Sequence, residues 1–372
     1  MRFVVDRNAF LRALGHITGI VERRNTIPIL SNVLIDAGEG GGLTLKATDL
    51  DVEAVETVPA KVEDAGAATV PAHTLHDIVR KLPEGAEIKI ERKGGEGRLK
   101  VTAGRASFEL AILPASDFPD MGQAELPHRF TIESGALKRL FEKARFAIST
   151  EETRYYLNGV YLHSVEADGR KLRAVATDGH RLAQVQTGCP AGAQEIPGVI
   201  VPRKTVGEVI KLLESEQAPV EVALSQAKIR FAVGGVVLTS KLIDGSFPDY
   251  VRVIPTTNKK TLLLENADLV KAVDRVSTLS SEKGRAVKLN ASEDRLVVSA
   301  SNPESGSATE EIPAEYRSEP IEIGFNARYL LDIAAQIDGS QTLFKLADAS
   351  SPTLISDDKD ATALYVLMPM RV

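Results

Sequence analysis

The residues best suited to chemistry form the short run Asp178-Gly179-His180. An aspartate beside a histidine can orient a general base, so this run could serve a hydrolase or nuclease built from repeats. Such an enzyme also needs a nucleophile, yet the sequence contains no G-x-S-x-G turn, and its single cysteine, Cys189, lies between a glycine and a proline. We therefore expect a protein without an active site and keep an enzyme centred on Asp178 and His180 as the alternative.

Sites for metals and nucleotides are also not indicated by the sequence. His73 and His76 lie three positions apart on a predicted helix, but no further pair of ligands follows them. The chain contains no P-loop, no Rossmann glycine pattern and no paired aspartates for two metal ions. We therefore expect no cofactor and no metal, and we place the two histidines on the surface of their helix.

Length and composition indicate a globular protein of several domains. The chain has 372 residues, of which 43% are hydrophobic and 26% are charged. No run of about 18 apolar residues could span a membrane, and residues 1–6 are too charged for a secretory signal. A single cysteine excludes an intrachain disulfide and suits a reducing compartment, so we expect a cytoplasmic protein without a membrane partner.

The elements that would position these residues repeat three times along the chain. One sequence motif, a hydrophobic strand followed by a small residue and an Asp or Asn, occurs at residues 43–49, 172–178 and 296–302. The strands are short and β-branched, with Gly94-Gly95 and Gly234-Gly235 as predicted hairpin turns. The helical spacing of apolar residues predicts helices at 7–16, 72–82, 136–146, 203–213, 267–276 and 326–338.

This arrangement predicts an α+β fold of three tandem domains, at residues 1–125, 126–256 and 257–372. Each domain is predicted to use a unit of strand, helix and further strands twice, so that two helices cover one face of a sheet. Three tandem copies often build a curved or closed object, although gene duplication alone would leave the same pattern.

The predicted helices are basic although the chain as a whole is acidic. The six helical ranges contain fourteen Lys and Arg against seven Asp and Glu, whereas the whole chain has a net charge of −6. A basic surface that reads no sequence suits the phosphate backbone of duplex DNA. Because Lys and Arg also decorate ordinary solvated helices, the charge by itself leaves both explanations open.

Several motifs resemble those of the bacterial DNA polymerase III beta subunit, the beta sliding clamp. They lie at residues 154–159, 176–182, 247–250, 324–326 and 368–371, and residues 26–30 are similar to a segment of the family's first domain. The likeness runs in the family's order from residue 1 to residue 372. It implies three tandem DNA-clamp domains, and two chains that close head to tail into a six-domain ring with helices inside and sheets outside.

The resemblance implies a processivity factor without enzymatic activity. The homodimeric ring would encircle double-stranded DNA without sequence preference, slide along it and work at replication forks in the nucleoid. A clamp loader complex driven by ATP would open it. The alpha subunit of the replicative polymerase, other polymerases and repair proteins would bind through short peptides that carry a glutamine and bulky apolar residues. A structural scaffold with no role on DNA remains the other alternative.

The resemblance also implies where subunits and DNA would be contacted. The dimer interface would join Phe108 and Leu110 of the first domain to Thr278 and Leu279 of the third domain of the other chain. Phosphate contacts would come from basic and tyrosine side chains, and packing within a strand stays open as an explanation for the two tyrosines. The implied DNA-binding residues are Arg24, Arg80, Arg139, Tyr155, Tyr156, Arg203 and Lys204.

The third implied site is a pocket for partner peptides between the second and third domains. Its Leu, Val, Pro and Met side chains would form an adaptable apolar floor, with polar anchors at the rim. Without the resemblance, the terminal Met-Pro-Met would be read as core filling of the last strand. The implied pocket residues are Leu157, Thr177, Gly179, His180, Arg181, Leu182, Pro248, Arg252, Val253, Asn326, Tyr329, Leu367, Met368, Pro369, Met370 and Arg371.

Overall fold

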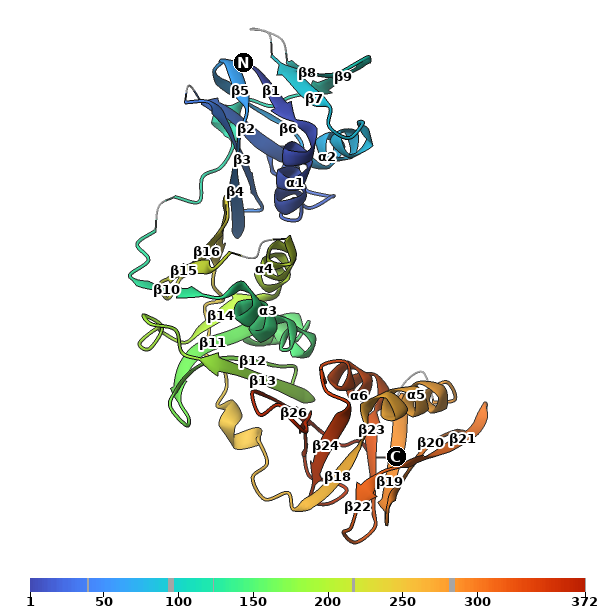
Figure 1. Cartoon of the computed structure of the whole chain (residues 1–372). Helices are drawn as coiled ribbons and strands as arrows, with labels where there is room; N and C mark the ends of the chain where they lie inside the picture. Colours follow the sequence, from blue (N-terminus) through green and yellow to red (C-terminus); the bar gives the residue numbers. More distant parts are fainter. Residues whose placement is uncertain (39, 93–96, 123, 216–217, 281–284, 372) are drawn as a thin grey trace. The chain divides into compact units, whose positions relative to one another are not determined.

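The computed structural model describes residues 1–372 with the exception of 39, 93–96, 123, 216–217, 281–284 and 372 (Figure 1). Residues 1–138, 190–197 and 204–242 form one compact unit, and residues 139–189, 198–203 and 243–372 form a second. The predicted turn at Gly94-Gly95 lies outside the described residues, whereas Gly234-Gly235 joins two paired strands of the first unit as predicted. None of the described helices is long and apolar enough to cross a membrane.

Each predicted helical range contains an α-helix. In α1 the carboxylate of Asp6 accepts the first free backbone N–H groups, and the apolar face of the helix is fully buried. The range predicted at 136–146 ends earlier because Ala144 donates its N–H to Phe141, three residues back, and the chain continues as a 3-10 turn. The α-helices are α1 (Arg7–Thr18), α2 (Ala72–Lys81), α3 (Ser134–Glu142), α4 (Arg203–Ser215), α5 (Asn266–Ser277) and α6 (Ala327–Ala334), and the 3-10 helices are η1 (Pro28–Ser31), η2 (Ala115–Asp117), η3 (Arg145–Ala147), η4 (Glu152–Leu157) and η5 (Tyr250–Val253).

The described residues of the first unit form two antiparallel sheets. One has the strand order β5-β1-β7-β8-β9, and the other has the order β10-β15-β16-β17-β4-β3-β2-β6. Helices α1 and α2 lie side by side against them (Figure 1). The strands are β1 (Arg2–Asp6), β2 (Asn32–Gly38), β3 (Gly42–Thr48), β4 (Val52–Val58), β5 (Lys61–Asp64), β6 (Gly66–Pro71), β7 (Glu87–Glu91), β8 (Arg98–Ala103), β9 (Ala106–Ala111), β10 (His128–Ile132), β15 (Val220–Leu224), β16 (Lys228–Val233) and β17 (Val236–Lys241).

The part of the second unit that the structure describes also forms two antiparallel sheets. Their strand orders are β14-β11-β12-β13-β26-β25-β24-β18-β22 and β21-β20-β19-β23. Helices α5 and α6 lie side by side here, as α1 and α2 do in the first unit (Figure 1). The strands are β11 (Gly159–Glu166), β12 (Arg170–Thr177), β13 (Arg181–Gly188), β14 (Val199–Pro202), β18 (Lys260–Glu265), β19 (Ala286–Ser292), β20 (Arg295–Asn302), β21 (Gly306–Pro313), β22 (Glu315–Tyr316), β23 (Ile321–Asn326), β24 (Gln341–Leu346), β25 (Thr353–Asp357) and β26 (Ala363–Leu367).

The sequence motif that occurs three times folds into the same kind of β-hairpin each time. It forms β3–β4, β12–β13 and β20–β21. In each turn the side-chain oxygen of the Asp or Asn accepts the backbone N–H two residues further on, at 2.9 Å from Asp49, 2.9 Å from Asp178 and 3.0 Å from Asn302. The predicted threefold repeat is therefore confirmed at the level of single hydrogen bonds.

Two of these hairpins continue into the sheet of the following repeat. Strand β4 pairs with β17 in the first unit, and strand β13 pairs with β26 in the second unit. We call these pairings the first and the second internal junction. The third hairpin differs, because its strand β21 lies at the edge of its sheet, and β9, which corresponds to β17 and β26, also lies at an edge.

Candidate functional site

The predicted pocket residues gather at the second internal junction. The turn before β13 contacts the end of the chain, since Met368 donates its N–H to the carbonyl of His180 at 2.9 Å. The His180 ring stacks on Tyr329 of α6 with 6.2 Å between centroids. On the other side, Leu182 packs in one apolar cluster with Tyr250 of η5 and Val366 of β26. The turn, η5, α6 and the C-terminal strand thus surround one surface of the second unit.

This surface has an apolar character with several exposed side chains. Val251, Val253 and Met368 are 59%, 49% and 40% exposed, whereas Leu157 and Leu367 are buried. Contiguous patches of exposed apolar side chains, unlike single ones, mark sites of interaction. Leu367 fills the core, as expected for a last strand, whereas Met368 is exposed and stays a predicted member of the groove.

Arg181 ties the walls of this surface together. Its guanidinium donates to Asp178 at 3.1 Å, to Asp332 of α6 at 2.5 Å and to the carbonyl of Phe146 at 2.7 Å. The same group lies over the Tyr329 ring, 4.2 Å from its centroid. The side chain is 10% exposed, so its donors are committed within the protein, and it joins the turn to α6.

Asp178 and His180 do not form a catalytic pair. The Asp178 carboxylate accepts the backbone N–H groups of His180 and Arg181 and pairs with the Arg181 side chain. The His180 ring lies instead against Tyr329. The carboxylate therefore shapes the turn and does not orient the imidazole, which removes the geometry that the enzyme alternative requires. Among the described residues, no group of three or more His, Cys, Asp or Glu is placed to hold a metal ion.

The other polar residues of the predicted pocket have different surroundings. Asn326 caps α6, because its side-chain oxygen accepts the N–H groups of Arg328 and Tyr329 at 3.0 and 3.3 Å. Arg252 is 84% exposed and pairs with Asp249 at 2.8 Å. Asn326 thus positions α6 through its oxygen, and Arg252 has a guanidinium that is largely open to solvent.

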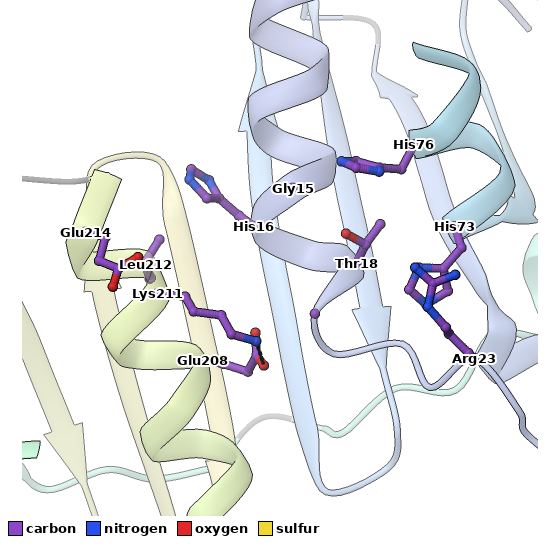
Figure 2. Close-up of a pocket in the computed structure, with 11 residues that line it drawn as sticks. Gly15, His16, Thr18, Arg23, His73, His76, Glu208, Lys211, Leu212 and Glu214 are labelled. Atoms are coloured by element: carbon purple, nitrogen blue, oxygen red, sulfur yellow. Dashed lines mark hydrogen bonds and ion pairs between the residues drawn. The ribbon is translucent and has the colours of Figure 1, made fainter. Parts of the chain in front are cut away.

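A second feature is a cavity of about 450 Å³ among the helices of the first unit (Figure 2). Figure 2 shows His73 and His76 on α2, Arg23 in the loop after α1, and Lys211 beside Glu208 on α4. The ring of His73 bonds to the carbonyl of Val21 at 2.8 Å, and burial lowers the pKa of His76. The two histidines, predicted on the helix surface, therefore line a cavity that also contains basic and acidic side chains.

Four of the predicted DNA contacts are open to solvent. Arg24 is exposed in the loop after α1, and Arg203 is exposed at the start of α4. Arg80 is 60% exposed although it pairs with Asp77 at 3.2 Å. Tyr155 is 54% exposed. Tyr156 is half-buried and meets the Tyr155 ring edge-on at 5.8 Å, so packing explains the second tyrosine better than the first.

Two other predicted contacts are committed to interactions inside their own units. Arg139 bonds to Asp360 and Thr362. Lys204 bonds to Asp49 at 2.5 Å and to the carbonyl of Ile20 at 2.9 Å. Burial would raise the pKa of Asp49, but the hydrogen bond from Lys204 and those from the backbone outweigh it and lower the pKa. Both cations thus join successive repeats. Their partners are 221 and 155 residues away, so the local sequence does not indicate these contacts.

The predicted interface residues lie on or beside the two strands at sheet edges. Phe108 is half-buried on β9, and Leu110 is 9% exposed on the same strand. Thr278 is exposed and Leu279 half-buried just after α5, which packs on β21 through an ion pair between Arg275 and Glu310. Phe108 and Leu110 belong to the first unit, and Thr278 and Leu279 belong to the second.

Comparisons with known proteins agree along the whole chain. The DNA polymerase III beta subunit family matches with its N-terminal domain at residues 1–122, its central domain at 131–249 and its C-terminal domain at 251–371. A beta sliding clamp from Caulobacter vibrioides is 53% identical, and one from Escherichia coli is 41% identical, each over 100% of both chains. A solved sliding clamp from Bartonella birtlesii, bound to griselimycin, superposes with a TM-score of 0.96 at 53% identity over 100% of both chains. The chain therefore belongs to the DNA polymerase III beta subunit family, the bacterial beta sliding clamps.

Proposed function

We propose that two copies of the chain close head to tail into a ring that encircles duplex DNA, slides on it and tethers replication and repair proteins. The observation that carries the ring is the pair of edge strands, β9 and β21. Each corresponds to strands that already join neighbouring repeats inside the chain. Exposed strand edges favour pairing with another chain, and a head-to-tail contact that closes avoids open filaments.

The two internal junctions share one register. Ala54 lies opposite Leu238 at the first junction, and Ala183 lies opposite Tyr365 at the second. These alanines occupy the same hairpin position, since each also faces an alanine across its own hairpin. All four residues are no more than 3% exposed. A small residue opposite a large one is therefore the packing rule of a completed junction.

The same rule gives the register of the contact between chains. Ala308 faces an alanine across the third hairpin, as Ala54 and Ala183 do in theirs. Phe108 occupies on β9 the position that Leu238 occupies on β17, counted from the preceding hairpin. Ala308 and Phe108 are half-buried, and their internal equivalents are buried. We infer that Ala308 of one chain lies opposite Phe108 of the other, next to Leu110, Thr278 and Leu279.

The proposed grip on DNA is electrostatic and indifferent to sequence. Arg24, Arg80, Arg203 and Tyr155 are exposed, and loose contacts to phosphates permit sliding because they favour no base. Arg139, Lys204 and Tyr156 would act at longer range or after local rearrangement, since they have partners within the protein or lie partly covered. Ring closure, and not tight binding, would keep the protein on DNA.

The proposed tether is the groove at the second internal junction. Val253 and Met368 offer exposed apolar surface, and Arg252 offers a cation at the rim. Peptides with a glutamine and bulky apolar residues suit that chemistry. Through it the chain would hold the polymerase alpha subunit, other polymerases and repair proteins, in the cytoplasm at replication forks. As a member of a family of processivity factors, the chain has no active site, and a clamp loader would use ATP to open the ring.

The test is retention on nicked circular DNA after loading with a bacterial clamp loader and ATP. Protein that stays on the circle and leaves when the circle is linearised is held by topology, which is the expected result. Protein that stays on linear DNA would be held by direct contacts, and the sliding proposal would fall. Absence from both forms would favour a scaffold without a DNA role.

A further inference from the structure

A buried polar network lies beneath η5. The Tyr250 hydroxyl is 2.9 Å from Nη1 of Arg173 and 3.0 Å from Nε2 of His163. Arg173 also donates through Nε and Nη2 to Oε1 of Gln186, at 3.1 and 2.8 Å. Arg173 is 8% exposed and Tyr250 is 6% exposed. The network belongs to the second unit and to strands β11, β12 and β13, which lead into the second internal junction.

The direction of one hydrogen bond in this network is fixed by chemistry. A guanidinium can only donate, so the Tyr250 oxygen accepts from Arg173. The bond between the Tyr250 hydroxyl and Nε2 of His163 takes its direction from the histidine tautomer. Burial, together with the nearby Arg173 charge, lowers the pKa of His163 to about 4, so the ring is neutral at physiological pH.

Aromatic packing holds the same segment from its other side. The Phe247 ring stacks on Tyr161 with 4.9 Å between centroids, and Tyr161 stacks on His163 at 4.4 Å. The Tyr250 ring meets His163 edge-on at 5.6 Å. At Gly198 a side chain would place its Cβ 2.3 Å from the Tyr161 hydroxyl, so this position needs glycine. Stacked and edge-on rings of this kind fix position as well as burying area.

The residues that follow Tyr250 are those that face a partner. Val251, Val253 and Arg252 are about half or more exposed, so burial contributes little to holding them in place. Tyr250, at the start of η5, is in contact with Leu182 and Val366 on the sheet. The buried Tyr250 therefore fixes the position of the exposed residues 251–253 relative to Leu182 and Val366 on the sheet.

We propose that Tyr250 anchors the pocket-lining residues of η5, and that Arg173 and His163 are positioning residues that act through its phenol oxygen. The inference rests on the proposed peptide groove and adds residues that were not among its predicted members. Tyr250 lies within the motif at 247–250, but Arg173 and His163 come from strands, so nothing in their sequence context marks them.

The first test is the affinity of a labelled synthetic peptide that carries one glutamine with leucine and phenylalanine. Tyr250→Phe keeps the ring and removes the hydroxyl, which leaves a donor of Arg173 unpaired. We expect the peptide Kd to rise by about tenfold. Tyr316→Phe is the matched control, because Tyr316 is 1% exposed, donates to the Glu319 carbonyl at 2.6 Å and lies on the last strand at the other side of the sheet.

The control separates positioning from general loosening. Both variants should lose similar thermal stability, while only Tyr250→Phe should lose peptide affinity. Equal peptide affinity of the two variants would overturn the inference. His163→Phe, which keeps a ring in the aromatic stack and removes the hydrogen bond to the Tyr250 hydroxyl, provides a second variant should Tyr250→Phe fold poorly, and the same loss is expected from it.

A double variant tests whether Arg173 acts through Tyr250. Arg173→Met alone should weaken peptide binding by about as much as Tyr250→Phe, and the two together should weaken it no further, because both break the hydrogen bond between Arg173 and the Tyr250 oxygen. Additive losses would show that Arg173 acts by another route and would contradict the proposal. If the unaltered protein fails to bind the peptide, the proposed groove itself is wrong, which is a distinguishable outcome.

Discussion

The two internal junctions use the same backbone pairing for different purposes. In both, the last strand of one repeat pairs in the same register with the second strand of the preceding hairpin. At the first junction the turn contains Leu50 and Asp51, and Asp51 pairs with Lys241 at 3.0 Å. At the second junction the corresponding residues are Gly179 and His180, and His180 stacks on Tyr329. The strand pairing joins the repeats at both junctions, and the two turns differ in what they contact.

The cations that cross the junctions differ in the same way. Lys204 reaches back to Asp49 at the first junction and is 31% exposed. Arg181 reaches forward to Asp332 at the second junction and is 10% exposed, with an aromatic ring beneath it. A planar guanidinium carries five donors in a rigid fork and stacks on aromatic faces, whereas an ammonium is a compact point charge. Arg181 therefore links the turn, α6 and the segment at Phe146 at the second junction.

Removing the crossing cation should have the largest effect and should separate the junctions most clearly. Arg181→Ala leaves the carboxylates of Asp178 and Asp332 without their cation, so we expect a loss of about 3–5 kcal/mol in the free energy of unfolding and loss of peptide binding. Lys204→Ala should cost less, about 1 kcal/mol, and should leave peptide binding intact. Denaturant unfolding and peptide titration measure both. Equal costs would mean that the two junctions are equivalent after all.

The packing rule shared by the junctions can be broken inside the chain or between chains. Leu238→Ala at the first junction should lower the free energy of unfolding by about 2–4 kcal/mol and leave the dimer intact. Phe108→Ala should cost the folded chain less and weaken each contact between chains by about 2–3 kcal/mol. Sedimentation equilibrium measures the dissociation constant of the dimer, and denaturant unfolding measures the free energy of unfolding. A Phe108→Ala protein that remains fully dimeric at nanomolar concentration would contradict the inferred register.

The buried histidine gives the second junction a pH dependence. The pKa of His163 falls from about 6.5 in the unfolded chain to about 4 in the folded protein. The unfolded chain therefore takes up a proton first as the pH drops, and stability should decrease between about pH 6.5 and pH 4, by at most about 3 kcal/mol. Denaturant unfolding at several pH values checks this. His163→Phe should flatten that part of the profile, and an unchanged profile would mean that other groups dominate it.

The smallest expected effects come from the turns themselves. Leu50 has φ of +79° and Gly179 has φ of +89°, a region that favours glycine. Leu50→Gly should therefore stabilise the protein by a few tenths up to about 1 kcal/mol, since its side chain is 41% exposed. Gly179→Ala should destabilise by about 1 kcal/mol, because its Cβ would also lie 2.7 Å from the Arg154 guanidinium. Thermal unfolding of the two variants should shift in opposite directions.

The sequence predicted those features that depend on local pattern. Helical spacing located α1 to α6, and the repeated motif ending at Asp49, Asp178 and Asn302 located the hairpins. These features could be predicted because the residues that decide them lie within a few positions of one another. The resemblance to a family supplied the groove residues that the pattern alone would have assigned to a strand core.

The sequence could not show which charged side chains are already occupied. Arg181 and Asp332 are 151 residues apart, and Lys204 and Asp49 are 155 residues apart. No local signal marks such pairs, so Lys204 and Arg139 were predicted to face DNA in the same way as the exposed Arg24. The role of Tyr250 was hidden for the same reason, since Arg173 lies 77 residues before it.

The edge strands β9 and β21 have a consequence for how a ring would assemble. At the internal junctions the strands are tethered by the chain, so they meet at an effective concentration of about millimolar or more. The first contact between two chains has no tether and must form from dilute solution. Once it exists, the second contact is intramolecular and gains the same advantage. Closure should therefore be cooperative, with free chains and complete rings well populated and half-joined pairs scarce.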